Sequence, residues 1–169
     1  MQLVLSLVLS RLDYCTSTLS GLPSSSLNRI QKVQNNAARR VLRKRKSDHV
    51  NPLLEKLHWL PVESRIHYKI ATLAFRHFEN SLPLYLSELL HTYQPSPTFR
   101  SSSEKLLKVP KTNFKSAASR SFHFPLSSHM PCCSLMETLF LQTSTALQLS
   151  SFKKNLKTHL FEERFTLGL

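Results

Sequence analysis

Glycine is nearly absent from this 169-residue chain, which contains only Gly21 and Gly168 against nine prolines. Glycine adopts positive φ angles without steric cost, so a chain this poor in it has few positions for tight hairpins or phosphate-cradling loops. A serine nucleophile in a Gly-x-Ser-x-Gly turn is excluded for the same reason. The composition favours helices that are interrupted by proline.

Cysteines and long apolar runs are also scarce. The three cysteines are Cys15, Cys132 and Cys133, and an odd number with one adjacent pair does not form a disulfide framework and indicates a reducing compartment. No stretch approaches the roughly 20 apolar residues that cross a bilayer. The apolar start ends at Arg11 and Asp13, without a basic leader or a small-residue cleavage site. We therefore expect no membrane partner and no secretion, and a nuclear or cytoplasmic location if the protein is expressed.

Acidic residues are missing altogether between Tyr14 and Ser47, in a chain whose formal charge is +13. The same stretch contains eight basic residues: Arg29, Lys32, Arg39, Arg40, Arg43, Lys44, Arg45 and Lys46. Such a field predicts a polyanionic partner, RNA or DNA before a membrane. Two other interpretations stay open. The run can be a nuclear localisation signal, or a solvated helix end whose dipole favours positive charge.

Apolar spacing predicts a mainly α fold, a short array of about four to five helices over residues 1–93. The expected helices cover residues 2–20, 27–42, 51–57, 61–80 and 83–93. The first is expected to be buried on most sides, because leucine and valine cover its circumference. In the second, the expected apolar stripe is Leu27, Ile30, Val33, Ala37, Ala38, Val41 and Leu42.

The ends of these helices have recognisable signals. Gly21 is expected in the left-handed conformation after the first helix. Ser24, Ser25 and Ser26 are candidate caps for the second, and Asn51 before Pro52 is a candidate cap for the third.

The pattern changes at Gln94. Residues 94–103 resemble a polar linker, residues 105–109 fit one short strand, and the Ser-rich stretch up to residue 151 keeps no period. We therefore divide the chain into a helical part (residues 1–93), an irregular part (94–151) and a C-terminal helix (152–165). The last helix places Phe152, Leu156 and Leu160 on one side.

Three segments together resemble a known family. They are residues 9–15 (LSRLDYC) with 21–23 (GLP), residues 31–39 (QKVQNNAAR), and residues 57–66 (LHWLPVESRI) with 68–70 (YKI). In this order and spacing they are similar to the segment that follows the polymerase palm in reverse transcriptases of LINE-type (non-LTR) retrotransposons. The tail at residues 151–161 (SFKKNLKTHLF) is similar to that family's ending. The resemblance covers roughly residues 3–122 and 149–163.

The resemblance implies a polymerase that copies RNA into DNA with paired palm aspartates holding two Mg²⁺ ions. No two of the chain's ten acids form such a motif: Asp13, Asp48, Glu55, Glu63, Glu79, Glu88, Glu104, Glu137, Glu162 and Glu163. The segment is thus expected to be the truncated, thumb-side remainder of the enzyme. The prediction is a non-catalytic fragment that binds RNA or DNA through its basic helix and uses no cofactor, metal or small-molecule substrate.

One departure from the family suggests decay. The family continues from an Arg-x-Phe motif, matched at Arg120 to Phe122, into a Trp-Asn-Ser-Leu-Pro segment that is missing here. Back-translating residues 136–141 and reading another frame yields Asn-Ser-Leu-Pro. We therefore hypothesise that about residues 123–148 are translated out of frame, a hypothesis that the genomic codons at these positions test.

Two further candidate sites need weighing. His123, His129, Cys132 and Cys133 are close in sequence, but an adjacent cysteine pair does not fit the two- to four-residue ligand spacing of structural zinc sites. Trp59 resembles a platform on which a base could stack, but we favour the interpretation that it anchors the junction between two helices. Two alternatives to nucleic-acid binding also stay open: a non-functional product of a translated pseudogene, and a helical module that a host uses to bind a protein.

Overall fold

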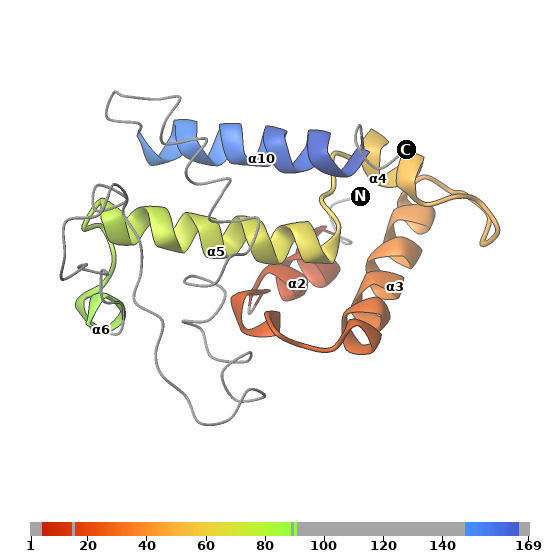
Figure 1. The fold of residues 1–169 in the computed structure, drawn as a ribbon. Helices are drawn as coiled ribbons and strands as arrows, with labels where there is room; N and C mark the ends of the chain where they lie inside the picture. Colours follow the sequence, from red (N-terminus) through yellow and green to blue (C-terminus); the bar gives the residue numbers. More distant parts are fainter. Residues whose placement is uncertain (1–4, 15, 89, 91–147, 166–169) are drawn as a thin grey trace. The chain divides into compact units, whose positions relative to one another are not determined.

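A computed structural model describes residues 5–14, 16–88, 90 and 148–165 (Figure 1). Its elements are, in chain order, η1 (Leu5–Leu9), α2 (Ser10–Tyr14), η2 (Thr16–Leu19), α3 (Ser24–Val41), α4 (Asn51–Lys56), α5 (Val62–Phe78), α6 (Leu84–Ser87) and α10 (Leu149–Phe165). The mainly α prediction is confirmed, because the described residues form helices and contain no strand. The predicted strand at residues 105–109, the histidine–cysteine group and nearly all of the suspected out-of-frame stretch lie outside the described residues.

The chain forms two compact units. One contains residues 1–69 and 154–169, and the other contains residues 70–153. Helix α5 begins in the first unit and ends in the second, whereas α10 begins in the second and ends in the first.

The first predicted helix is wrong in two respects. Residues 5–14 and 16–19 form three short pieces, the π-helical η1, α2 and the 3₁₀-helical η2, in place of one helix. The hydroxyl groups of Ser10 and Thr16 each donate to the carbonyl group four residues earlier, a bond that competes with regular helix hydrogen bonding. The segment is also not buried on most sides, since Leu7 is 66 % exposed and Tyr14 is 84 % exposed.

Two predicted caps are also wrong. Pro23 occupies the N-cap of α3 and Val50 that of α4, and neither helix start has a side-chain cap. Ser24 and Asn51, the first predicted caps, are instead the first residues of the two helices, one position too late to act as N-caps. Gly21 does adopt the expected left-handed conformation, with a φ of 77°.

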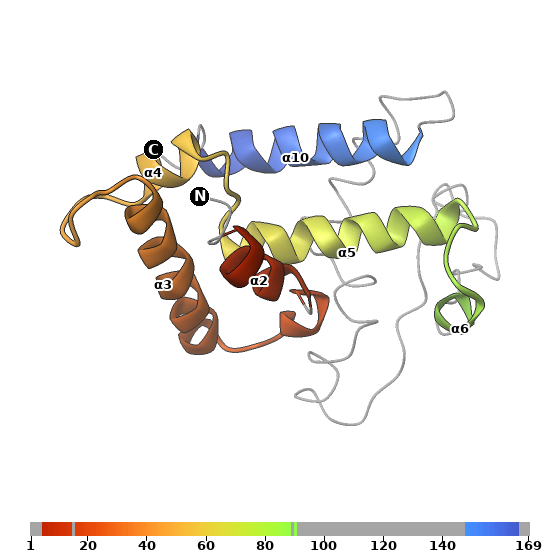
Figure 2. The ribbon, with the colours of Figure 1, turned by 180° about the vertical axis from the view of Figure 1, so that it is seen from behind.

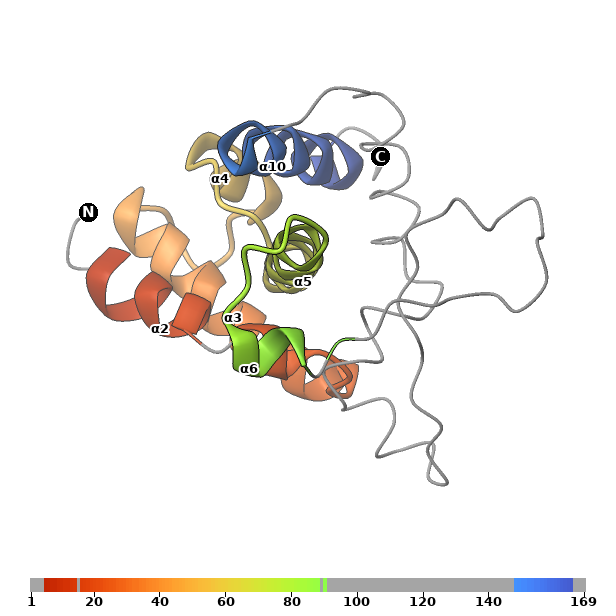
Figure 3. The same ribbon diagram turned by 90° about the vertical axis from the view of Figure 1, so that its left-hand side faces the viewer.

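The first unit has a hydrophobic core in which the start of the chain, α3 and α4 meet. Leu9, Ala37, Ala38, Leu54 and Trp59 form this cluster. Partly buried apolar residues pack around it: Val8, Leu12, Val41, Val50, Leu57 and Phe165. In Figure 3, α2 lies beside α3, as these contacts require. The alanines of α3 permit close packing because they lack long side chains.

In the described part of the second unit, the end of α5 packs against the start of α10. The rings of Phe75 and Phe152 stack there, with centroids 4.1 Å apart and planes inclined by 17°. Helix α10 starts at Leu149, three residues before the predicted start at residue 152, and so includes the turn that positions Phe152. Of the helix predicted over residues 83–93, α6 forms the four residues Leu84–Ser87, Glu88 and the buried Leu90 are not helical, and residues 89 and 91–93 lie outside the described residues.

Three helices end in the same left-handed motif although none of them has a glycine there. Arg43, His58 and Asn80 have φ angles of 51°, 53° and 52°. After α3, the N–H of Lys44 donates to the carbonyl of Arg39 (2.9 Å) and the N–H of Arg43 to that of Arg40 (3.3 Å). The corresponding pairs of bonds follow α4 and α5. This is the Schellman arrangement, which glycine usually completes because it has no Cβ.

The positive φ angle of Arg43 strains the backbone there, and we expect its substitution to change the stability. Arg43→Gly should unfold with a free energy about 1 kcal/mol higher than Arg43→Ala, because a Cβ is costly at positive φ. Both substitutions remove the same charge, so they should bind nucleic acid equally. Urea denaturation of the two variants measures the difference, and an alanine variant as stable as the glycine variant would contradict the expected strain.

Candidate nucleic-acid interface

Helix α3 separates its buried and basic sides along its length. Gln34, Ala37 and Ala38 are buried, whereas Arg29, Lys32 and Arg40 are exposed. These three basic positions recur at intervals that keep them on one side of a helix with 3.6 residues per turn. From residue 29 to residue 40 the side extends about 16 Å. A row of this kind can follow several successive phosphates.

A basic loop continues from the end of α3. Arg43, Lys44, Arg45 and Lys46 are all exposed in the connection to α4. Figure 1 and the reverse view in Figure 2 both show this loop, drawn in orange, extending away from α3 and α4. We call the seven exposed residues of helix and loop the basic surface: Arg29, Lys32, Arg40, Arg43, Lys44, Arg45 and Lys46.

Asp48 holds the loop in a turn. Its carboxylate accepts a hydrogen bond from the N–H of Arg45 (3.0 Å), and its own N–H donates to the carbonyl of Arg45 (3.2 Å). Lys46 therefore lies at the tip of a closed turn. The acid that ends the long acid-free stretch thus serves to shape the basic surface, while its charge offsets one of the neighbouring cations.

Arg39 does not belong to the basic surface, contrary to the sequence prediction. Its side chain is half-buried and its Nη2 donates to the carbonyl of Asp48 (3.1 Å). Its Nε is buried without a hydrogen-bond partner. Arg39 fastens the basic loop to the end of α3, because its position in the helix turns it toward the loop. The other seven predicted basic residues are exposed as expected.

Trp59 is an anchor and not a stacking platform. Only 4 % of its surface is exposed, which leaves no free ring face for a base, so the possible stacking role is wrong and the burial agrees with the favoured anchor interpretation. The N–H of Trp59 donates to the carbonyl of Leu54 (2.9 Å), and both side chains lie in the core cluster. Such an apolar contact commonly accompanies the Schellman motif. The indole therefore fixes the turn between α4 and α5.

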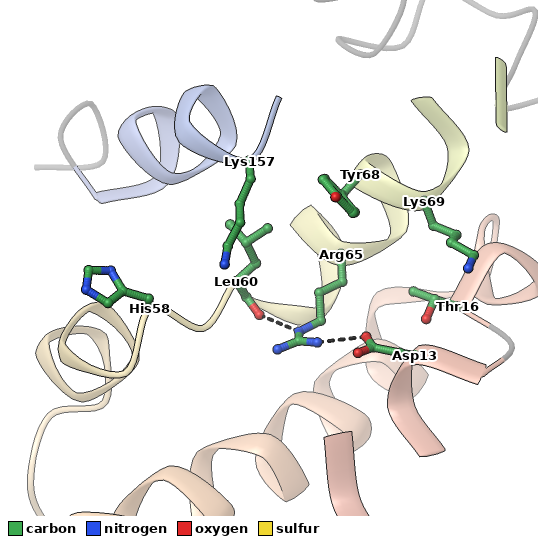
Figure 4. Close-up of a pocket in the computed structure, with 8 residues that line it drawn as sticks. All are labelled: Asp13, Thr16, His58, Leu60, Arg65, Tyr68, Lys69 and Lys157. Atoms are coloured by element: carbon green, nitrogen blue, oxygen red, sulfur yellow. Dashed lines mark hydrogen bonds and ion pairs between the residues drawn. The ribbon is translucent and has the colours of Figure 1, made fainter. Parts of the chain in front are cut away.

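The three sequence segments that carry the family resemblance are joined by one hydrogen-bonded network. Gln34 donates to the carbonyl of Leu60 (2.7 Å), and the side-chain oxygen of Gln31 accepts from the N–H of Val62 (2.8 Å). Arg65 donates to the same Leu60 carbonyl (2.8 Å) and pairs with Asp13 (2.7 Å), as Figure 4 shows. Gln31 thus satisfies a free N–H at the start of α5 from a different helix.

Sequence analysis missed this network. It placed Val33 on the buried stripe of α3, but Val33 is 52 % exposed and its neighbour Gln34 is fully buried. A polar residue at a buried helical position needs a partner, and Gln34 follows Ile30 by four residues and precedes Ala38 by four. That spacing was the available signal, although the partner carbonyl lies 26 residues away in sequence.

Burial shifts the pKa of two ionisable groups near the network, His67 and Tyr68. Burial lowers the pKa of His67 from its usual 6.5, partly opposed by the charges of Glu63 and Glu163. Burial also raises the pKa of the Tyr68 phenol. His67 is thus kept neutral and Tyr68 protonated near pH 7.

The described part of the chain contains no group of three or more histidine, cysteine, aspartate or glutamate residues that could hold a metal ion. Within that same part, no helix is long and apolar enough to cross a membrane.

No family model, curated protein or solved structure matches this chain.

Proposed function

We propose that this chain is a non-catalytic, nucleic-acid-binding part of a LINE-type reverse transcriptase that contacts the RNA or DNA backbone through its basic surface. One observation carries the proposal: seven exposed lysine and arginine residues lie on one side of α3 and in the loop that follows it. The neighbouring acid, Asp48, is half-buried and occupied with the turn. Phosphates are the common polyanion that such a field attracts.

The packing of α3 favours nucleic acid over a membrane surface. A helix that lies in a membrane interface inserts an apolar side into the lipid. In α3 the corresponding side is occupied, because Ala37 and Ala38 pack in the core cluster and Gln34 is tied to Leu60. Apart from Val33, the exposed residues of α3 are charged or polar, which suits contacts with phosphates.

The absence of catalysis is part of the proposal. Two-metal phosphoryl transfer needs carboxylates that are close together and free to bind magnesium. Asp13 is paired with Arg65, and Asp48 accepts a hydrogen bond within its turn. In this proposal the segment positions nucleic acid for chemistry carried out by another part of the polymerase.

Binding as a function of salt tests the proposal. Phosphate contacts release counterions, so the logarithm of the affinity for a short duplex should fall with the logarithm of salt concentration with a slope of about −4 to −6. The affinity should depend little on sequence. A slope near zero would contradict the proposal, and a protein complex that persists at high salt would favour the protein-interaction alternative.

A further inference from the structure

A second candidate site lies within the first unit, and no residue of the basic surface lines it. It is an open pocket of about 330 Å³ between the end of α2, the start of η2, the α4–α5 turn, the start of α5 and the middle of α10. Figure 4 shows side chains from these segments around it. Its volume is at the lower end of the range for small-molecule sites, about 300–1,000 Å³.

The lining of this pocket is rich in positive charge. Arg65, Lys69 and Lys157 contribute three cations, against one acid, Asp13. The Asp13 carboxylate is already paired with Arg65 at 2.7 Å, so the two lysines have no acid of the pocket to themselves. Lys69 comes from α5 and Lys157 from α10, and they line the pocket on opposite sides of Arg65 (Figure 4). An anion is the ligand that such a lining attracts.

Arg65 is held in place for binding. Its side chain is only 14 % exposed, and its Nε and Nη1 donate to the Leu60 carbonyl and to Asp13. A guanidinium has five N–H groups, so three remain for a ligand after these two bonds. Little side-chain entropy would be lost on binding, because the arginine is already oriented.

Two rings complete the lining. Tyr68 is half-buried, and burial raises the pKa of its phenol, which therefore remains a neutral hydrogen-bond donor. The His58 ring lies 5.7 Å from the ring of Phe161, which limits its movement. A pocket that combines cations with rings can accept both parts of a nucleotide, since the cations attract phosphate and ring faces stack with bases.

We infer that this pocket binds a single nucleotide, with its phosphate at Arg65, between Lys69 and Lys157, and its base against the ring of Tyr68 or of His58, which lie on different sides of the pocket. The inference extends the proposed function, because the nucleotide can be one unit of a strand that the basic surface holds. A free mononucleotide has the same phosphate and base, so it is the alternative ligand for this pocket.

The test uses AMP and a short single-stranded oligonucleotide as probes with the full chain. Lys69→Gln/Lys157→Gln removes two exposed pocket charges and should weaken AMP binding about tenfold. The control, Lys56→Gln/Lys154→Gln, removes two exposed charges that do not line the pocket and should change AMP binding less than about twofold. Calorimetry measures the affinities, and circular dichroism checks that both variants are folded.

The outcomes separate this inference from the proposed function. Equal AMP affinity in the two double variants, with oligonucleotide binding retained, would overturn the pocket and leave the basic surface intact. Selective loss of AMP binding without any oligonucleotide binding would support the pocket and contradict the proposed function. If the oligonucleotide binds and AMP does not, the affinity for the oligonucleotide should fall more in Lys69→Gln/Lys157→Gln than in the control. That result would show that the bound nucleotide belongs to a strand. Inorganic phosphate competing as well as AMP would contradict a nucleotide site.

Discussion

Gln34→Glu should destabilise the first unit by about 3 kcal/mol at pH 7, because it introduces a buried negative charge that keeps a single hydrogen-bond donor, the side-chain amide of Gln31. Gln34 is fully buried, and its amide nitrogen donates to the Leu60 carbonyl at 2.7 Å. A carboxylate there would place an anion against that carbonyl oxygen. The same exchange is nearly neutral on a surface, so the size of the loss measures how closed the network is.

The loss should depend on pH with a definite sign. Burial raises the folded-state pKa of the introduced carboxyl above its usual value of about 4.3. The unfolded state therefore releases the proton first as the pH rises. The variant should approach wild-type stability below about pH 4 and fall behind as the pH increases. Urea denaturation at several pH values provides the measurement.

Gln31→Glu is the matched control for this prediction. The side-chain oxygen of Gln31 accepts from the N–H of Val62 at the start of α5, where the helix dipole favours negative charge. Its amide nitrogen donates to Gln34 and Asn35, and these two bonds would be lost. We expect a destabilisation of about 1 kcal/mol with weak pH dependence. Equal losses for the two variants would contradict the different roles that we assign to the two glutamines.

Trp59→Ala should lower the free energy of unfolding by about 3–5 kcal/mol. The indole is 4 % exposed and lies in the cluster with Leu9, Ala38 and Leu54, so its removal leaves a cavity that backbone hydrogen bonds prevent from closing. For a small domain this is a large part of the total stability. Chemical denaturation followed by circular dichroism measures the loss.

Trp59→Phe separates packing from any role in binding. A smaller ring should retain part of the packing and lose less stability than alanine. Because Trp59 is buried, the phenylalanine variant should bind nucleic acid as tightly as the wild type. A stable Trp59→Phe variant with strongly reduced affinity would revive a stacking role for this residue.

The helices were predicted best where apolar residues recur at helical spacing over several turns and a helix-ending signal follows. This was so for α3 and α5, which end close to the predicted residues. The division of residues 5–14 and 16–19 into short pieces was not predicted, because apolar spacing does not distinguish π, α and 3₁₀ turns. The choice between Val33 and Gln34 failed because neighbouring positions differ by only 100° around a helix, and a distant carbonyl decided between them.

The candidate interface was predicted at the level of charge but not of geometry. Exposure of Arg29, Lys32, Arg40 and the loop cations follows from their polarity and spacing. The structural role of Arg39 could not be predicted, since it depends on the turn that Asp48 forms after the helix. The pocket could not be predicted from the sequence for a similar reason, because Lys69 and Lys157 are far apart in sequence and line the same pocket only in the folded chain.

The most direct test compares the salt dependence of nucleic-acid binding in two fourfold variants with equal loss of charge. The first removes charges from the basic surface: Arg29→Gln, Arg40→Gln, Lys44→Gln and Lys46→Gln. The second removes four exposed charges outside the basic surface and the pocket: Arg11→Gln, Lys56→Gln, Lys154→Gln and Arg164→Gln. For a short duplex, the first should flatten the slope by about three to four, and the second should leave it nearly unchanged. Equal flattening in both variants would mean that net charge, and not this surface, binds the nucleic acid.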